Sequence, residues 1–214
     1  ANKFMVDNGH AVQVSEMMEK IKNSESLDDL KFDLYKNYLL SDIKEKFERY
    51  KPLVDELAEK QSKVIDVNFL GDKVLVEYAK FSNFVNVSIH LFRNMVDHGI
   101  ETEDERIEKT KPQRGNIKVE FKNEGDSFSI NLKDDGGGID PQRIKDKVLE
   151  KSLKSEEELK NLKDSDLVDM IFLPGFSTKE EVTDVSGRGV GMDAVRTEVE
   201  SLGGTISVTS KINE

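Results

Sequence analysis

One predicted helix, over residues 77–97, carries polar side chains that could bind a ligand. Successive residues lie about 100° apart around a helix, so its polar residues share a stripe about 80° wide: Asn83, Asn86, His90, Asn94 and Asp97. The opposite side is apolar and is expected to face the core: Phe81, Phe84, Val85, Leu91, Phe92, Met95 and Val96. A solvated helix face normally carries Lys and Glu, and this stripe carries neither. It therefore indicates the wall of a binding site, although a polar face satisfied by neighbouring loops fits the same residues.

A first glycine-rich segment, residues 134–138, reads Asp-Asp-Gly-Gly-Gly and directly follows a predicted strand over 128–132. Three glycines let the backbone turn tightly and let a flat ligand approach closely. The carboxylate of Asp134 could accept a hydrogen bond from an exocyclic amine. Because Asp-Gly turns after strands are common, this segment alone is also compatible with an ordinary turn.

A second glycine-rich segment, Gly-Arg-Gly-Val-Gly at residues 187–191, precedes a predicted helix over 192–202. Such a loop offers unpaired N–H groups and the positive end of a helix dipole to phosphate. No Lys-Ser/Thr follows it, so it is not a P-loop, and its glycines do not have the Gly-x-Gly-x-x-Gly spacing of dinucleotide-binding folds. The segment indicates a site for an anion.

The remaining elements predict an α+β fold, a two-layer α/β sandwich. Strands are expected at 63–70 and, with strict alternation of apolar residues, at 117–121 and 128–132 around a turn at 123–126. A helix is expected at 141–151 and a last strand at 205–209, after Gly203-Gly204. Residues 152–190, polar apart from 167–172, are expected to form a mobile lid.

The first part of the chain predicts a helical segment. Apolar residues recur at threes and fours from residue 12 to about residue 60, with a break near 23–26 where Ser26 could cap the second helix. The two helices could pack on the domain that follows or could form a dimerisation hairpin. The sequence leaves both alternatives open.

Composition excludes several classes of protein. The net charge of −11 argues against a nucleic-acid surface, which needs clustered Lys and Arg. No apolar run approaches the roughly 20 residues of a membrane span, so no membrane insertion is expected. With no cysteine there is no disulfide or thiolate metal site. An Ala at position 1 and the lack of a charged-then-apolar leader favour a fragment excised from a longer protein.

Three motifs, taken in order, resemble the N, G1 and G2 boxes of the superfamily of gyrase, Hsp-type chaperone, histidine kinase and MutL ATPases. They are HLFRNMVDHGIE at 90–101, DDGGGID at 134–140 and PGFSTKEEVTDVSGRGVGMDAV at 174–195. Within the superfamily the chain resembles the chemotaxis histidine kinase CheA family, over about residues 63–210. The resemblance implies a histidine kinase-like ATPase fold, with a helical segment at 1–62 and an ATP-binding catalytic domain at 63–214.

The resemblance also implies ATP and Mg²⁺ as cofactors and assigns roles to residues. Asn94 would be the Mg²⁺ ligand, and His90 would be the general base that takes the proton from an incoming histidine. Asp134 would accept a hydrogen bond from N6 of adenine. The other implied nucleotide contacts are Asp97, His98, Gly136, Gly138, Arg143, Lys147, Ser177, Lys179, Gly187, Arg188, Gly189, Gly191 and Met192.

The function implied is that of an ATP-dependent protein-histidine kinase. The γ-phosphate would go to a histidine on a separate phosphotransfer domain or protein, with a response regulator downstream, in a bacterial cytoplasm or at a membrane-associated signalling array. An acceptor outside the chain is expected because His90 and His98 fall in the ATP site and His10 in an irregular lead-in. The segment before residue 63 keeps only the closing Leu-Val-x-x-Leu-Ala pattern of the family's dimerisation hairpin, so a homodimer through these helices stays open.

Two other functions fit the same motifs. A conformational ATPase of the gyrase or chaperone kind uses a Glu beside the Asn box to activate water, and here His90 stands in that neighbourhood. A nucleotide-binding signalling adaptor of the same fold would bind ATP without transferring phosphate. The products separate the three: phosphohistidine on a partner, free phosphate, or neither.

Overall fold

The computed structural model describes residues 19, 21–23, 28, 31, 39–176 and 191–212. At its centre is a three-stranded sheet in the order β2-β4-β5, made of β2 (Ile65–Gly71), β4 (Gly115–Asn123) and β5 (Phe128–Asp134). Strand β2 runs parallel to β4, and β4 pairs with β5 as an antiparallel hairpin. The predictions of these three strands are confirmed.

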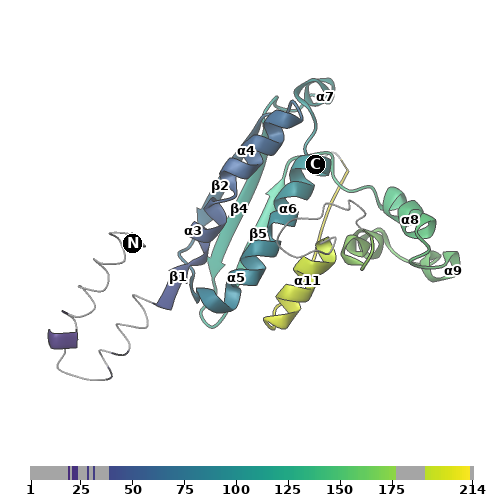
Figure 1. The fold of residues 1–214 in the computed structure, drawn as a ribbon. Helices are drawn as coiled ribbons and strands as arrows, with labels where there is room; N and C mark the ends of the chain where they lie inside the picture. The colour runs from purple at the N-terminus through teal and green to yellow at the C-terminus, as the bar shows by residue number, and fades with distance from the viewer. Residues whose placement is uncertain are drawn as a thin grey trace, which may run out of the picture.

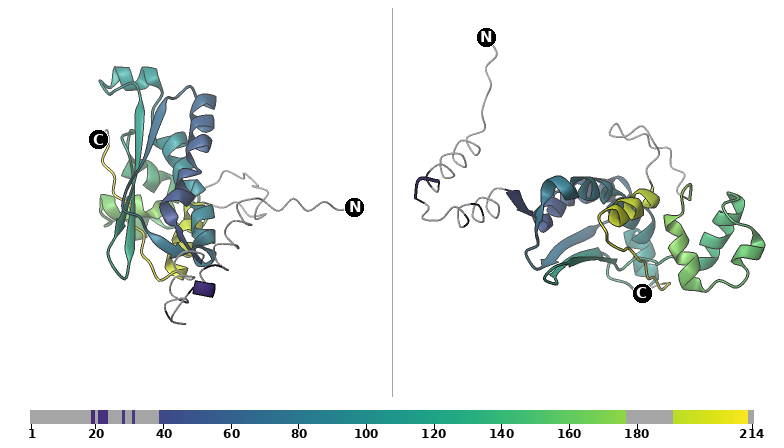
Figure 2. Two further views of the ribbon diagram at one scale, coloured as in Figure 1. Left: turned by 90° about the vertical axis from the view of Figure 1, so that its left-hand side faces the viewer. Right: turned by 90° about the horizontal axis from the view of Figure 1, so that it is seen from below.

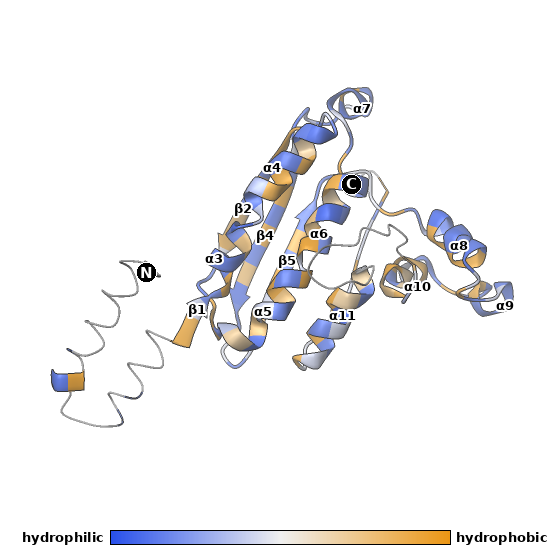
Figure 3. Ribbon diagram, in the orientation of Figure 1, coloured by the Kyte–Doolittle hydropathy of each residue, from blue (hydrophilic) through white to orange (hydrophobic). Residues whose placement is uncertain are grey.

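One face of the sheet is apolar because side chains alternate along each strand. In β4 the residues Ile117, Val119 and Phe121 are buried, whereas Lys118 and Glu120 between them are exposed. The alternating colours along β4 in Figure 3 show this pattern. The helices α3 (Ile43–Glu48), α4 (Lys51–Lys60), α5 (Tyr78–Val87) and α6 (Ile89–Asn94) lie on this apolar side (Figures 1 and 2). The result is the predicted two-layer sandwich.

The helix predicted over 77–97 is a helical run of three parts. Helix α5 is followed by a break at Ser88, whose buried hydroxyl donates to the carbonyl of Phe84 at 2.7 Å. Helix α6 then passes into a π-helix, η2 (Met95–Gly99), in which the N–H of Ile100 bonds the carbonyl of Met95 at 2.8 Å. A π-turn closes over one more residue than an α-turn, so the 100° spacing assumed for the polar stripe does not hold beyond Asn94.

Residues 40–60 differ from the continuous helices predicted for them. Strand β1 (Leu40–Asp42) pairs antiparallel with β3 (Leu75–Glu77), which the sequence did not reveal. The carboxylate of Asp42 ends this strand and caps α3, because it accepts from the N–H groups of Lys44 at 3.1 Å and Val74 at 3.2 Å. The helices predicted before residue 39 fall almost wholly outside the described residues.

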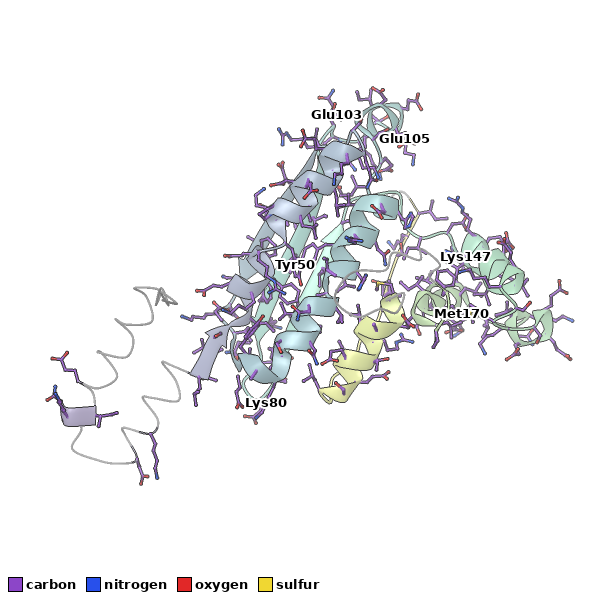
Figure 4. All side chains as sticks on the ribbon, viewed as in Figure 1. Tyr50, Lys80, Glu103, Glu105, Lys147 and Met170 are labelled. Carbon is purple, nitrogen blue, oxygen red and sulfur yellow. The ribbon has the colours of Figure 1, made fainter. Side chains whose placement is uncertain are left out.

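Helices α3 and α4 share one hydrophobic core with the sheet. Phe47 and Val54 are fully buried in the same cluster as Phe92 and Phe121. Tyr50, labelled in Figure 4, reaches across to α5, where its hydroxyl donates to the carbonyl of Val85. The division at residue 62/63 stays a prediction, and residues 43–58 supply part of the sheet's own core.

A second, smaller core lies beside the sheet. It is formed by α8 (Pro141–Glu150), α9 (Glu156–Leu159), α10 (Asp164–Asp169) and the 3-10 helix η3 (Met170–Phe172). Its buried residues are Val148, Leu159, Leu167, Met170 and Phe176. Lys147 and Met170 are labelled in this region in Figure 4. The helix at 141–151 is confirmed.

The prediction of a mobile lid is wrong for residues 152–176, which form these short helices. The sequence holds the reason, because Ser155 and Glu158 make a capping box at the start of α9. The N–H of Ser155 donates to the Glu158 carboxylate at 2.8 Å, and the N–H of Glu158 donates to the Ser155 hydroxyl at 3.3 Å. Residues 177–190 lie outside the described part of the chain.

Helix α11 (Met192–Ser201) is confirmed; it packs against the larger core and also contacts η3. Val199 and Leu202 pack against the larger core. Arg196 reaches the smaller one, where its Nη2 lies 2.6 Å from the Asp169 carboxylate and its guanidinium carbon 4.2 Å from the centroid of the Phe172 ring. This arginine therefore joins α11 to the α10–η3 corner.

The strand predicted over 205–209 is wrong. After Gly203, whose φ is +77°, residues 204–211 belong to no regular element. Ile206 and Val208 are half-buried between exposed neighbours, as in a strand, but no described strand pairs with them. Alternation reports only which side chains face the protein, and a strand also needs a ladder of backbone hydrogen bonds.

The sequence also missed helix α7 (Glu103–Glu108), which Thr102 and Glu105 begin with a capping box. Glu103 and Glu105 are labelled on it in Figure 4.

Among the described residues, no helix is both long and apolar enough to span a lipid bilayer.

Candidate functional site

The glycine loop at residues 134–138 packs against the end of the helical run that carries His90 and Asn94. The N–H of Gly137 donates to the carbonyl of Gly99, the last residue of η2, at 2.8 Å. A Cβ added at Gly136 would lie 2.0 Å from that same carbonyl oxygen. Only glycine fits there, so the first glycine of the loop is required by the contact between the loop and η2.

Asp134 stands at the end of β5 and is half-buried, with its carboxylate beside Gly99. Its Oδ1 accepts the N–H of Gly136 at 3.0 Å. Burial raises the pKa of Asp134 above its ordinary value, although the hydrogen bond from Gly136 opposes the rise. A carboxylate held away from water in this way is a strong acceptor for a neutral N–H donor such as an exocyclic amine.

The third glycine of the loop, Gly138, meets the C-terminal segment. Its φ is +76°, and a Cβ there would lie 2.3 Å from the carbonyl oxygen of Lys211. The next residue, Ile139, donates its N–H to the hydroxyl of Ser210 at 2.8 Å. The two glycines expected to flank a flat ligand are thus both needed for backbone packing, Gly136 against η2 and Gly138 against residues 210–211.

His90 and Asn94 are half-buried one turn apart on α6. Burial lowers the pKa of His90, the nearby Arg93 lowers it further, and Asp193 on the first turn of α11 opposes both. Helices α6 and α11 contact each other, which brings Asp193 near His90. A histidine with a lowered pKa is neutral at pH 7 and can take up a proton.

The other members of the predicted polar stripe are directed elsewhere. Asn86 accepts from Arg49 Nη2 at 2.6 Å, and Asn83 is exposed. Asp97 accepts from Gln61 Nε2 at 2.6 Å, beside the end of α4. The stripe therefore does not act as one wall: the structure keeps His90 and Asn94 together and turns Asp97 toward Gln61.

The neighbouring residue His98 is exposed at the end of η2. The roles of Asp97 and His98 at the metal–phosphate end stay predictions. Of the two cations on α8, Arg143 is exposed. The ammonium of Lys147 lies 4.6 Å from the centroid of the Phe176 ring, and Lys151, one turn on, donates to the carbonyl of Phe176 at 2.7 Å.

The start of α11 is suited to an anion. Its N-cap is Gly191, with no side-chain cap among the described residues, and Met192 behind it is buried. The first N–H groups of a helix without a cap are free to bind phosphate, with the helix dipole in their favour. The other residues expected here, Ser177, Lys179, Gly187, Arg188 and Gly189, lie outside the described residues.

The predicted ligand of a divalent cation, Asn94, offers one hard donor, its amide oxygen. The described residues contain no group of three or more His, Asp or Glu side chains placed so that they could hold a metal ion. This donor set fits Mg²⁺, which binds through few protein ligands and keeps water and substrate phosphate oxygens.

Sequence reasoning missed the ionic groups behind the glycine loop. Arg106, with no exposed side-chain surface, lies 2.8 Å from the carboxylate of Asp135 and 3.2 Å from that of Glu101. Lys111 lies 3.1 Å from the carboxylate of Glu101. Glu101 belongs to the quoted motif, but nothing in the spacing of Arg106 and Lys111 points to a site.

A family model described as "Histidine kinase-, DNA gyrase B-, and HSP90-like ATPase" matches residues 86–214, more than half of the chain. Those residues include the α6–η2 run, the glycine loop and α11. The chain therefore belongs to this family of ATPases, and the predicted fold class is confirmed.

Individual relatives describe the chain more narrowly than the family model does. The chain is 31% identical to the chemotaxis protein CheA of Bacillus subtilis, over 97% of this chain and 32% of that protein. It is 40% identical to CheA of Borreliella burgdorferi, over 78% and 19%, and 39% identical to CheA of Halobacterium salinarum, over 94% and 30%. The resemblance to CheA is confirmed, and the chain spans about a third or less of the length of these relatives.

Proposed function

We propose that this chain is the ATP-binding core of a protein-histidine kinase similar to CheA. It would transfer the γ-phosphate of ATP to a histidine on a separate phosphotransfer domain or protein. The observation that carries the proposal is the contact of the glycine loop with Gly99. That contact joins the loop that would bind the base to the helical run that carries His90 and Asn94.

Each half of the nucleotide would have its own set of residues. The buried carboxylate of Asp134 would accept a hydrogen bond from the exocyclic amine of adenine, beside Gly136 and Gly138. At the other end, the N–H groups at the start of α11 would bind phosphate oxygens. Lys147 on α8, Met192, and the undescribed residues 177, 179 and 187–189 would complete the phosphate side.

His90 would act as the general base. Because its pKa is lowered, its imidazole is neutral near pH 7 and can take the proton of an incoming histidine. The amide oxygen of Asn94 would hold Mg²⁺, which when bound offsets the negative charge of the phosphates. Catalysis would then rest on positioning and electrostatics, as in phosphoryl transfer generally.

The partners follow from the reaction. The acceptor histidine would lie outside the chain, and a response regulator would receive the phosphate next, in a bacterial cytoplasm or at a membrane-associated signalling array. A homodimer through the helices of residues 1–62 and a regulatory role in chemotaxis belong to the same proposal.

Calorimetric titration tests the nucleotide site. A non-hydrolysable ATP analogue, titrated with and without Mg²⁺, is expected to bind the unaltered chain. Asp134→Ala should abolish binding because the base loses its acceptor. Asn94→Ala should leave binding that no longer depends on Mg²⁺. An Asp134→Ala variant that binds as well as the unaltered chain would contradict the proposed site.

Transfer is tested with γ-labelled ATP and a separate histidine phosphotransfer domain of the CheA type. The expected product is phosphohistidine, recognised because it is labile in acid and stable in base, and His90→Gln should slow its formation without weakening nucleotide binding. Free phosphate as the main product would favour a conformational ATPase. Binding with neither product would favour a nucleotide-binding adaptor.

A further inference from the structure

Behind the glycine loop lies a cluster of ionic side chains, here called the Glu101 network: Glu101, Arg106, Lys109, Lys111 and Asp135. The Glu101 carboxylate accepts from Arg106 at 3.2 Å, and from Lys109 and Lys111 at 3.1 Å each. Its side chain is only 8% exposed and that of Arg106 is not exposed at all. Such a buried group of charges needs several partners to offset its desolvation.

We propose that Lys111 is a positioning residue for the base of the nucleotide, acting through the backbone of the glycine loop. This rests on the proposed function, in which Asp134 accepts from adenine. Besides Glu101, the ammonium of Lys111 donates to the carbonyl of Asp135 at 3.1 Å and to the carbonyl of Gly136 at 2.7 Å. Its three donors thus have three acceptors, two of them in the loop.

These bonds fix the orientation of two successive peptide planes. In the plane between Asp135 and Gly136, the carbonyl accepts from Lys111, and the N–H donates to the Asp134 carboxylate at 3.0 Å. In the plane between Gly136 and Gly137, the carbonyl again accepts from Lys111, and the N–H donates to Gly99. Glycine rotates freely about its backbone, so without the carbonyl bonds each plane would be held at its N–H end alone.

The peptide plane between Asp135 and Gly136 controls the orientation of the Asp134 carboxylate directly. Its N–H is the group that bonds Asp134 Oδ1, so a rotation of the plane moves the donor that orients the carboxylate. Arg106 also donates to the carbonyl of Asp135, at 3.2 Å, but among the described residues only Lys111 donates to the carbonyl of Gly136. Lys111 is therefore the one member of the Glu101 network that holds both planes.

The charges of the network support this arrangement. Burial would raise the pKa of Glu101, but hydrogen bonds from its own backbone, Lys111 and Lys109 outweigh burial, and the pKa is lowered. Glu101 is then ionised at neutral pH and keeps the ammonium of Lys111 beneath the loop.

Lys109 provides a matched control. It makes the same 3.1 Å ion pair with Glu101, but it bonds neither loop carbonyl and its side chain is 44% exposed, against 14% for Lys111. Changing either lysine to Met removes one cation from Glu101 and keeps an unbranched apolar chain. The difference between the two variants reports the bonds to Asp135 and Gly136.

The test compares binding of ADP and of inosine diphosphate by calorimetry, in the unaltered chain, Lys111→Met, Lys109→Met and Asp134→Ala. Inosine has a carbonyl in place of the exocyclic amine of adenine. The ratio of the affinity for ADP to that for inosine diphosphate therefore reports how well the Asp134 carboxylate is oriented toward the amine. In Lys111→Met we expect ADP to bind about tenfold more weakly and the ratio to fall toward one, because two hydrogen bonds from a charged donor are lost. In Lys109→Met both affinities should stay within about twofold of the unaltered chain.

The outcomes separate the two proposals. Equal behaviour of the two lysine variants, or an equal loss of both ligands in Lys111→Met, overturns the positioning role. Lack of ADP binding by the unaltered chain, or an Asp134→Ala variant that keeps the preference for ADP, overturns the proposed base site and the positioning role with it. If Lys111→Met does not fold, Lys111→Gln, which keeps N–H donors without the charge, takes its place, with a smaller loss of ADP affinity expected and no loss overturning the proposal.

Discussion

The glycine loop allows a sharp comparison between two adjacent glycines. A Cβ at Gly136 would lie 2.0 Å from the carbonyl oxygen of Gly99 and 2.7 Å from Asp134 Oδ1. To restore a contact of 3.0 Å, the loop and η2 must move apart by the difference, 3.0 − 2.0 = 1.0 Å. Overpacking of this kind costs about 1–3 kcal/mol, and stretching the bond from Gly137 to Gly99 adds about 1 kcal/mol. Gly136→Ala should therefore lower the free energy of unfolding by about 2–4 kcal/mol.

Gly137→Ala is the matched control. Its Cβ would meet the Glu101 carboxylate at 3.5 Å, an ordinary contact, and its φ is not in the left-handed region. The substitution should change the free energy of unfolding by less than about 1 kcal/mol, toward greater stability if anything, because Ala restricts the unfolded chain.

Urea unfolding followed by circular dichroism measures the two free energies, and calorimetry at a temperature where both variants are folded measures ADP affinity. We expect ADP to bind more than tenfold more weakly to Gly136→Ala, since the shift displaces the bond to Asp134, and nearly unchanged to Gly137→Ala. If the two variants agree within about 0.5 kcal/mol in stability and within twofold in affinity, the close approach of the loop to η2 does not control the site.

Two further predictions concern titration. The pKa of Asp134 is raised above its ordinary 3.8, so the folded chain holds this proton more tightly than the unfolded chain does. The protonated carboxyl therefore stabilises the fold at low pH, and this stability is lost as the pH rises through the folded pKa. Asp134→Asn should therefore be more stable to urea than the unaltered chain at pH 7, with a difference that shrinks below about pH 4; lower stability at pH 7 would contradict burial as the main cause. The pKa of His90 should lie below its ordinary 6.5 in an NMR titration and should fall further in Asp193→Asn, because Asp193 raises it; an unchanged midpoint in that variant would show that α11 does not act on His90.

Local patterns in the sequence predict the sheet and the glycine loop well. Alternation along Ile117, Val119 and Phe121 reports a strand with one buried face, and an Asp-Gly run after a strand reports a turn. Asp134 could be proposed from the sequence for this reason, because its predicted role depends on residues adjacent to it.

The prediction that the polar residues of the helix predicted over 77–97 share one stripe is wrong beyond Asn94, where the backbone spacing changes. The 100° rule placed Asp97 beside Asn94, but the π-helix η2 adds a residue to the turn, and Asp97 instead contacts Gln61. The proposed role of Lys111 could not be predicted from the sequence for another reason. Its acceptors lie 24 and 25 residues further along the chain, and only the folded hairpin brings them together.

Arg196 has a consequence for how the chain opens locally. It ties α11, whose Val199 packs with the sheet, to Asp169 and Phe172 at the edge of the smaller core. A small core opens at a lower free energy than the whole chain, so amide hydrogens of α10 should exchange with solvent well before those of β4. The guanidinium of Arg196 limits how independently the smaller core opens. Helices α10 and η3 can separate from α11 only after their contacts with this guanidinium break. Release of the Arg196 side chain is thus one step in any opening of the smaller core that leaves α11 on the sheet.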